Sequence, residues 1–190
     1  MRVTRKIRES NFDLKRLTGL FLMIGVIATP TSVFSSNTGG SDASLDALIH
    51  KCLPRSHHHI MKAIVRVESS GQKYAINVNG GKNGNYSKTF SKKTEAKKAI
   101  RQLMEKGYNF DTGLAQINST HFRKDKIFGK IGLTPLDALE PCNNLKMGAA
   151  IFSDNFRRYG TISEALSAYN TGNRHKGFEN GYIKRYLPKE

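Results

Sequence analysis

Residues 56–71 read Ser-His-His-His-Ile-Met-Lys-Ala-Ile-Val-Arg-Val-Glu-Ser-Ser-Gly, which is the pattern of an amphipathic helix. Ser56 is a preferred N-cap residue and Gly71 a preferred terminator, so the pattern predicts a helix between them. Two neighbouring apolar stripes recur at helical spacing: Ile60, Ile64 and Val67 in one, and Met61 and Val65 in the other. We expect the rest of the chain to pack around this helix.

Glu68 extends the second stripe, because it lies three residues after Val65 and seven after Met61. Its carboxyl group is therefore predicted to face the core, beside the negative end of the helix dipole. Apolar surroundings and the dipole both disfavour the ionised form. We therefore predict a raised pKa for Glu68, as a general acid near neutral pH requires. The alternative is that Glu68 only caps the last turn at the surface.

The basic charge of the chain belongs mainly to its predicted folded part. The 190 residues carry a formal charge of +16, and the part after residue 17 keeps 25 basic and 13 acidic residues, or +12. Such a charge favours a polyanionic partner, which is a nucleic acid, an anionic membrane face or an acidic cell-wall polymer. The sequence has no recognisable nucleic-acid-binding motif, so nucleic acid is not expected as a partner.

The N-terminal segment has the pattern of a secretory signal. Basic residues up to Arg16 precede an apolar run from Leu17 to Ala28, which is too short for an ordinary membrane span. We predict a signal peptide over residues 1–35, a flexible lead-in over residues 36–44, and one domain over residues 45–187. An uncleaved anchor is the alternative. The protein is expected to be exported to the periplasm or cell envelope.

Cys52 and Cys142 are the two cysteines of the chain. An even pair in an exported protein suggests a disulfide, which would contribute roughly 2–4 kcal/mol by closing a long loop. Two distant cysteines are a poor metal site, and successive histidines at residues 57–59 point about 100° apart on a helix. We therefore expect no metal, and we expect no cofactor.

Hydrophobic periodicity and turn residues predict the other elements, for a mainly α (α+β) single domain with one small β-hairpin. The predicted helices span residues 45–51, 91–107, 135–139, 141–160, 163–171 and 181–186, and the predicted hairpin pairs residues 74–79 with 86–90. Ser91 and Ser163 are the expected N-caps. The core face of the 91–107 helix is expected to hold Ala96, Ile100, Leu103 and Met104, with lysines on its other face.

Residues 113–118 read Gly-Leu-Ala-Gln-Ile-Asn and are interpreted as one turn of helix. This turn would present the amides of Gln116 and Asn118 inward, and amides suit sugar recognition because they both donate and accept hydrogen bonds. Asp111 is interpreted as a residue that caps this turn or supports the site.

Six short motifs follow one another in the chain, at residues 67–71 (Val-Glu-Ser-Ser-Gly), 75–80, 111–118, 141–145, 168–172 (Ala-Tyr-Asn-Thr-Gly) and 181–183. Their order and spacing resemble the lysozyme-like lytic transglycosylases, most closely those of type IV secretion and conjugation systems. The resemblance covers roughly Leu45 to Tyr186. The segment from Asn77 to Lys106 resembles an insertion typical of the secretion-linked branch, and a disulfide between the two cysteines also fits that branch.

The resemblance implies a goose-type lysozyme-like fold and cleavage of peptidoglycan between N-acetylmuramic acid and N-acetylglucosamine. It implies the following site residues: Glu68 as acid and base, Ser69, Gln116 and Asn118 in the substrate groove, Tyr169 and Asn170 on the sugar, and Tyr182 against the Glu68 carboxyl group. The implied partners are the glycan strands and subunits of a secretion or conjugation apparatus.

A transglycosylase of this family needs one carboxyl group, because the muramic C6 hydroxyl attacks C1 of its own sugar and gives a 1,6-anhydro product. Two alternatives remain at this point. A hydrolase would use water as the nucleophile and would need Asp111 or another group to position it. A non-catalytic module would bind peptidoglycan or an apparatus subunit without needing Glu68.

Overall fold

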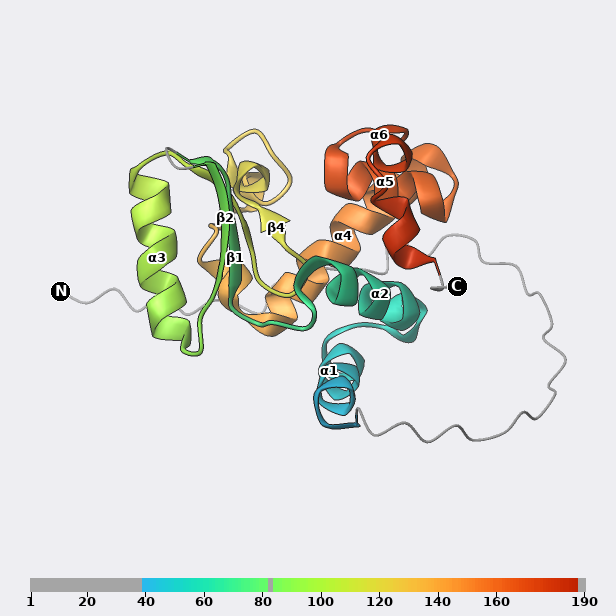
Figure 1. Ribbon diagram of the computed structural model, residues 1–190, viewed down its shortest axis with the longest axis horizontal. Coiled ribbons are helices and arrows are strands. Elements are labelled where there is room, and N and C mark those ends of the chain that lie inside the picture. The colour runs from blue at the N-terminus through green and yellow to red at the C-terminus, as the bar shows by residue number, and fades with distance from the viewer. Residues whose placement is uncertain (1–38, 82–83, 188–190) are drawn as a thin grey trace, which may run out of the picture. The chain divides into compact units, whose positions relative to one another are not determined.

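Helix α4 (Pro141–Tyr159) contacts α1, α2, α5 and strand β4, and so joins the helical part of the molecule to the sheet (Figure 1). The computed structural model describes residues 39–81 and 84–187, all within one unit that spans residues 37–190. The predicted signal peptide lies outside the described residues. Pro141 begins α4 and Gly160, with a φ of +81°, ends it, as predicted. The predicted mainly α (α+β) fold is confirmed.

Helix α1 (Gly39–Cys52) begins six residues before its predicted start, so most of the segment predicted as a flexible lead-in is helical. The predicted disulfide is confirmed: Cys52 at the end of α1 is bonded to Cys142 in the first turn of α4, with 5.1 Å between their Cα atoms. This bond ties α1 to α4 across a sequence separation of 90 residues.

Helix α2 (His58–Ser69) contains Glu68 in its last turn. The predicted N-cap is wrong, because Ser56 lies in a preceding 3-10 helix, η2 (Arg55–His57), and no side chain caps α2. Met61, Ile64 and Val65 are buried, as the apolar stripes predict. Ser70, with a φ of +52°, ends the helix one residue before Gly71.

The predicted hairpin is confirmed, but it is half of a four-stranded antiparallel sheet with the order β2-β1-β3-β4. Its strands are β1 (Ala75–Gly81), β2 (Gly84–Thr89), β3 (Asn109–Thr112) and β4 (Ile117–Asn118). The alternation along β1 sets the two faces of the sheet. Ile76 and Val78 are buried in a cluster with α3, whereas Asn77 and Asn79 are only half-buried.

The helical turn predicted over residues 113–118 is wrong. These residues form a tight turn from β3 into β4, closed by a hydrogen bond from the Gln116 amide nitrogen to the Gly113 carbonyl. Gly113 and Gln116 both have positive φ, at +81° and +46°. A Cβ atom at Gly113 would lie 2.3 Å from Nδ2 of Asn144, so only glycine fits there. A contact with a distant helix therefore decides the local conformation.

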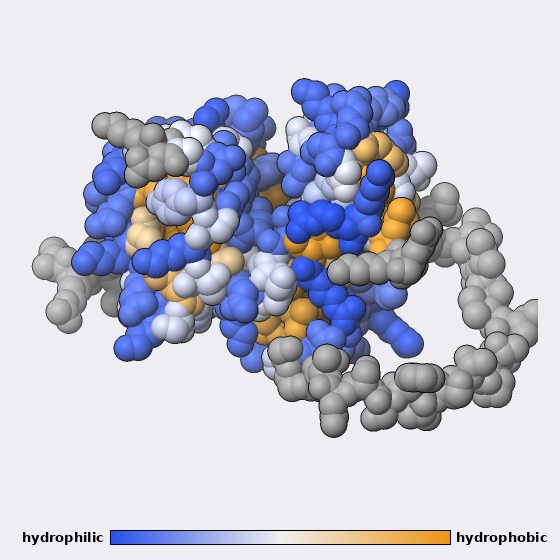
Figure 2. Space-filling model, viewed as in Figure 1, coloured by the Kyte–Doolittle hydropathy of each residue, from blue (hydrophilic) through white to orange (hydrophobic). Residues whose placement is uncertain are grey.

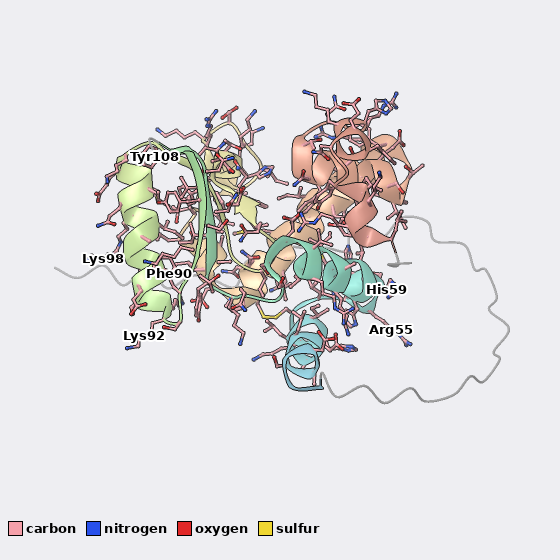
Figure 3. All side chains as sticks on the ribbon, in the orientation of Figure 1. Arg55, His59, Phe90, Lys92, Lys98 and Tyr108 are labelled. Atoms are coloured by element: carbon pink, nitrogen blue, oxygen red, sulfur yellow. A yellow bond between two sulfur atoms is a disulfide. The ribbon has the colours of Figure 1, made fainter. Side chains whose placement is uncertain are left out.

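Helix α3 (Lys93–Glu105) covers the apolar face of the sheet (Figure 1). Ala96, Ile100 and Leu103 are buried as predicted, but Met104 is 41% exposed. Ser91 does not cap α3, whose N-cap is Lys92 without a side-chain hydrogen bond. The outer face of α3 carries exposed lysines, including Lys98 (Figure 3).

The C-terminal part is helical and packs on α4. It consists of α5 (Ile162–Thr171), α6 (Lys176–Glu179) and the 3-10 helix η6 (Ile183–Tyr186). The N-cap of α5 is Thr161, which accepts a hydrogen bond from the Glu164 amide nitrogen, and not Ser163 as predicted. Short 3-10 helices η3 (Ser119–Phe122), η4 (Gly129–Ile131) and η5 (Asp137–Leu139) connect β4 to α4. Within residues 39–81 and 84–187, no helix is long and apolar enough to span a membrane.

Candidate active site

A cavity of about 1130 Å³ lies between the polar face of the sheet and helices α2, α4 and α5. Figure 2 shows a hollow between the sheet side and the α5–α6 side, with hydrophilic residues along its rims. The lining includes most of the predicted site residues: Glu68, Ser69, Gln116, Asn118, Tyr169 and Asn170. With Asn77 and Asn79, which also line the cavity, the fold brings together residues from four of the six sequence motifs.

Glu68 lies in the cavity wall at the C-terminal turn of α2. Burial raises the pKa of its carboxyl group, in agreement with the prediction from the helix pattern. A hydrogen bond from Tyr182 and the positive charge of Arg185 act in the opposite direction, and the negative charge of Asp111 adds to the rise. The net direction is upward, as a general acid requires.

Tyr182 donates its hydroxyl proton to Oε1 of Glu68 at 2.5 Å. The tyrosine is 4% exposed and is not part of the cavity lining, so it contacts the carboxyl group from the protein side. The hydroxyl of Tyr186 lies 2.6 Å from that of Tyr182. Arg185 lies 5.7 Å from the centre of the Tyr182 ring and donates a hydrogen bond to the Val67 carbonyl oxygen.

Asp111 is the centre of an amide network on the polar face of the sheet. Its Oδ1 accepts from Asn118 at 2.8 Å, and its Oδ2 accepts from Asn79 at 2.8 Å and from Asn77 at 3.5 Å. Ser87 on β2 donates to the Asn77 side chain at 2.6 Å. Of the two roles predicted for Asp111, capping is wrong, because the residue belongs to strand β3. Its hydrogen bonds to three amides fit the alternative role of a support residue.

The Transglycosylase SLT domain family matches residues 50–189 of the chain. The chain belongs to this family. No solved structure matches it. Curated relatives include Protein virB1 of Rhizobium radiobacter, which is 33% identical over 152 residues, or 76% of this chain and 60% of the relative. Type IV secretion system protein virB1 of Brucella abortus is 36% identical over 141 residues, or 70% of this chain and 56% of the relative.

A shorter match is Invasion protein IagB of Salmonella typhimurium, which is 40% identical over 80 residues, or 42% of this chain and 47% of the relative. The chain thus spans less than two thirds of the length of each of these curated relatives. The region of this chain that corresponds to the SLT domain, residues 50–189, includes all six motifs that line or support the cavity.

In this SLT domain, Ser69 and Tyr169 fix the turn between β3 and β4 against the helices. The Ser69 hydroxyl donates to the Leu114 carbonyl oxygen at 2.7 Å, and the Tyr169 hydroxyl donates to the Ala115 carbonyl oxygen at 2.7 Å. Burial, followed by the charge of Glu68, raises the pKa of Tyr169, so its phenol stays protonated. Both residues line the cavity, but their hydroxyl protons are used within the protein.

The side-chain amide of Gln116 donates to the carbonyl oxygens of Gly113 (2.7 Å) and Ala75 (3.3 Å). Both contacts use its nitrogen, which leaves the side-chain oxygen as the group suited to accept a hydrogen bond from a sugar. Asn170 is exposed in the cavity wall, so its amide can turn toward a ligand.

Sequence reasoning missed four residues of this site. Asn77 and Asn79 were detectable, because their alternation with Ile76 and Val78 places them on the face of the sheet opposite the core. Arg185 and Tyr186 carried only a weak signal, as members of the short helix predicted over residues 181–186. Their relation to Glu68 depends on how η6 packs against α2.

Proposed function

We propose that this SLT domain is a peptidoglycan lytic transglycosylase, which cleaves the β-1,4 bond between N-acetylmuramic acid and N-acetylglucosamine and forms 1,6-anhydro-N-acetylmuramic acid. One observation carries the proposal: a half-buried carboxyl group with a raised pKa, Glu68, opens on a polar cavity and has one oxygen bonded by Tyr182. Membership of the Transglycosylase SLT domain family supports the same reaction.

In the first step, protonated Glu68 transfers its proton to the glycosidic oxygen. The bond between that oxygen and C1 of the muramic sugar breaks, and its electron pair leaves with the N-acetylglucosamine oxygen, which becomes a hydroxyl group. The raised pKa of Glu68 keeps this proton available to a higher pH than in an ordinary glutamate. The hydrogen bond from Tyr182 to Oε1 leaves Oε2 as the oxygen suited to carry the proton toward the substrate.

In the second step, the ionised Glu68 acts as a base. It removes the proton of the muramic C6 hydroxyl while that oxygen attacks C1, and the new C1–O6 bond closes the anhydro ring. Glu68 ends protonated, so the residue is ready for the next cycle and no water is consumed. The fixed hydrogen bond from Tyr182 stabilises the carboxylate formed between the two steps.

A hydrolytic reaction is the second candidate, because Asp111 shares the cavity lining with Glu68. A retaining or inverting glycosidase needs a second carboxylate with oxygens available to a sugar carbon or to water. Both oxygens of Asp111 already accept amide hydrogen bonds from Asn118 and Asn79. This arrangement suits a residue that orients the amides of the sheet face, and therefore favours the transglycosylase.

The glycan strands of peptidoglycan are the proposed substrate, and the amides of Asn77, Asn79, Gln116, Asn118 and Asn170 supply donors and acceptors for sugar hydroxyl and N-acetyl groups. The reaction as written requires neither a metal nor a cofactor. One of the curated relatives, the virB1 protein of Brucella abortus, carries the name of a type IV secretion system protein. By extension we propose that this protein acts in the cell envelope and opens the wall locally for a secretion or conjugation apparatus.

Mass spectrometry of muropeptides released from purified peptidoglycan tests the proposal, with Glu68→Gln as the isosteric control. We expect muramic products lighter by one water than those of a lysozyme, and no release by the variant. Products with ordinary reducing ends would identify a hydrolase. Equal binding of sacculi by both proteins without any release would identify a non-catalytic module.

A further inference from the structure

Three oxygen atoms form a chain that leads from the C-terminal segment to the candidate acid. The Tyr186 hydroxyl lies 2.6 Å from the Tyr182 hydroxyl, which lies 2.5 Å from Oε1 of Glu68. The two tyrosine rings pack edge to face with their centres 5.3 Å apart. Tyr182 is buried and Tyr186 half-buried, so packing restrains both rings.

Proton counting fixes the direction of this chain when Glu68 is ionised. A phenol has one proton to donate, and a carboxylate can only accept. Tyr182 therefore gives its proton to Glu68, and the remaining short contact requires Tyr186 to donate to Tyr182. We infer that Tyr186 is a positioning residue: by donating to Tyr182, it commits the Tyr182 proton to Oε1 of Glu68 and leaves Oε2 to carry the catalytic proton.

The opposite direction would impair the reaction. If Tyr182 donated to Tyr186, Glu68 would have to donate its own proton from Oε1 to Tyr182. That proton would then point away from the cavity, because Tyr182 is not part of the cavity lining. A phenol at position 186 that acts as a donor disfavours this arrangement. The inference deepens the proposed function and depends on Glu68 being its acid.

The electrostatic surroundings agree with this direction. Burial, followed by the charge of Glu68, raises the pKa of Tyr182. Burial also raises the pKa of Tyr186, although its hydrogen bond with Tyr182 acts in the opposite direction, so both phenols remain protonated donors. The charged and titratable groups that act on Glu68 or feel its charge come from three elements besides α2: Arg185, Tyr182 and Tyr186 from the C-terminal segment, Asp111 from β3, and Tyr169 from α5.

Removal of the Tyr186 hydroxyl is expected to raise the pKa of Glu68, because Tyr182 becomes a weaker donor to the carboxylate. Polarisation along a hydrogen-bond chain changes each bond by roughly 10–30%. The alkaline limb of the pH–rate profile should therefore move up by about 0.3 pH unit in Tyr186→Phe, and by about 1 unit in Tyr182→Phe, where the bond itself is lost. Tyr186→Phe keeps the ring and its packing.

The double variant Tyr182→Phe/Tyr186→Phe separates this role from a structural one. If Tyr186 acts through Tyr182, the second substitution should add no shift to the pH profile of Tyr182→Phe. Tyr108→Phe is the matched control, since Tyr108 is a half-buried tyrosine packed in the cluster between α3 and the sheet. It should leave the profile unchanged.

A ¹³C NMR titration of the Glu68 carboxyl carbon, assigned with Glu68→Gln, gives a readout that needs no activity. A higher pKa in Tyr186→Phe than in the natural protein supports the inference. An unchanged or lower pKa overturns it, as does an additional shift in the double variant. If the protein releases no muropeptides, the proposed function fails, but the titration still decides whether Tyr186 acts on Glu68.

Discussion

The Asn144 side chain fixes the conformation of Ala115, because its Oδ1 accepts a hydrogen bond from the Ala115 amide nitrogen at 2.7 Å. The same buried amide donates to the carbonyl oxygens of Thr112 and Ala138 at 2.8 Å each. Asn144 is 1% exposed, so water cannot replace these bonds. One residue of α4 thus holds the turn whose carbonyl groups are bonded by Ser69 and Tyr169.

Asn144→Ala should therefore destabilise the protein strongly, because it leaves three buried backbone groups unpaired. We expect a loss of about 3 kcal/mol or more in the free energy of unfolding, measured by urea denaturation. Asn143→Ala is the control, since Asn143 is half-buried and makes one long hydrogen bond of 3.4 Å. Similar losses in the two variants would contradict the role given to Asn144.

Glu68→Gln should stabilise the protein at neutral pH. Burial raises the pKa of Glu68 above the ordinary value of a glutamate, so the folded state favours the protonated form. This contribution is complete below the unfolded pKa and is lost as the pH rises through the folded pKa. Glutamine does not ionise and avoids the loss. The difference in Tm between variant and natural protein should therefore increase from about pH 4 to about pH 8.

A pH-independent difference in Tm would contradict the raised pKa of Glu68. Glu95→Gln, on the exposed face of α3, is a matched control for the loss of one negative charge. Its effect on Tm should not follow that of Glu68→Gln across the same pH range.

Asp111→Asn should lower the rate without changing the product. The substitution removes the charge that orients the amides of Asn79 and Asn118, so we expect the rate of glycan cleavage to fall by about 10-fold or more. Muropeptide mass spectrometry should still find anhydro ends. If the variant loses all activity and the natural protein produces reducing ends, Asp111 is a second catalytic carboxylate and the reaction is hydrolytic.

Loss of the disulfide should reduce stability without affecting the chemistry at Glu68. The Cys52→Ser/Cys142→Ser variant should lose about 2–4 kcal/mol in the free energy of unfolding, because its unfolded chain is no longer cross-linked. The rate per folded molecule should remain the same at a temperature well below Tm. Reduction of the natural protein should reproduce the loss, and a fall in rate without a fall in stability would contradict this account.

The basic outer face of α3 is expected to attract anionic wall polymers. Lys97 and Lys98 are exposed there, on the side of the sheet away from the cavity, so Lys97→Glu/Lys98→Glu should weaken binding to purified sacculi. Added salt should weaken binding by the natural protein as well. Lys51→Glu/Arg55→Glu makes the same change in charge on exposed residues of α1 and η2; Arg55 is labelled in Figure 3. Equal effects of the two pairs, or no effect of salt, would refute a role of α3.

Helix periodicity in the sequence predicted the local features of this protein. The stripe of Met61 and Val65 placed Glu68 on the inner side of α2, and the structure half-buries this residue and raises the pKa of its carboxyl group accordingly. The alternation in β1 was sufficient to predict the hairpin, and the proline and glycine at the ends of α4 were sufficient to predict where that helix begins and ends. Each of these features depends on neighbours within a few residues. The presence of two cysteines was enough to predict their disulfide.

Only the tertiary structure decided the contacts that give Glu68 its surroundings. Tyr182 is 114 residues away from Glu68 in the chain, and Asp111 meets Asn79 across two paired strands. The turn at residues 113–116 was predicted as helix because its apolar residues suit a helix, but Asn144 and the pairing of β3 with β4 override that preference. Local periodicity determines which face of an element is buried, whereas the partner of each buried polar group depends on how distant elements pack.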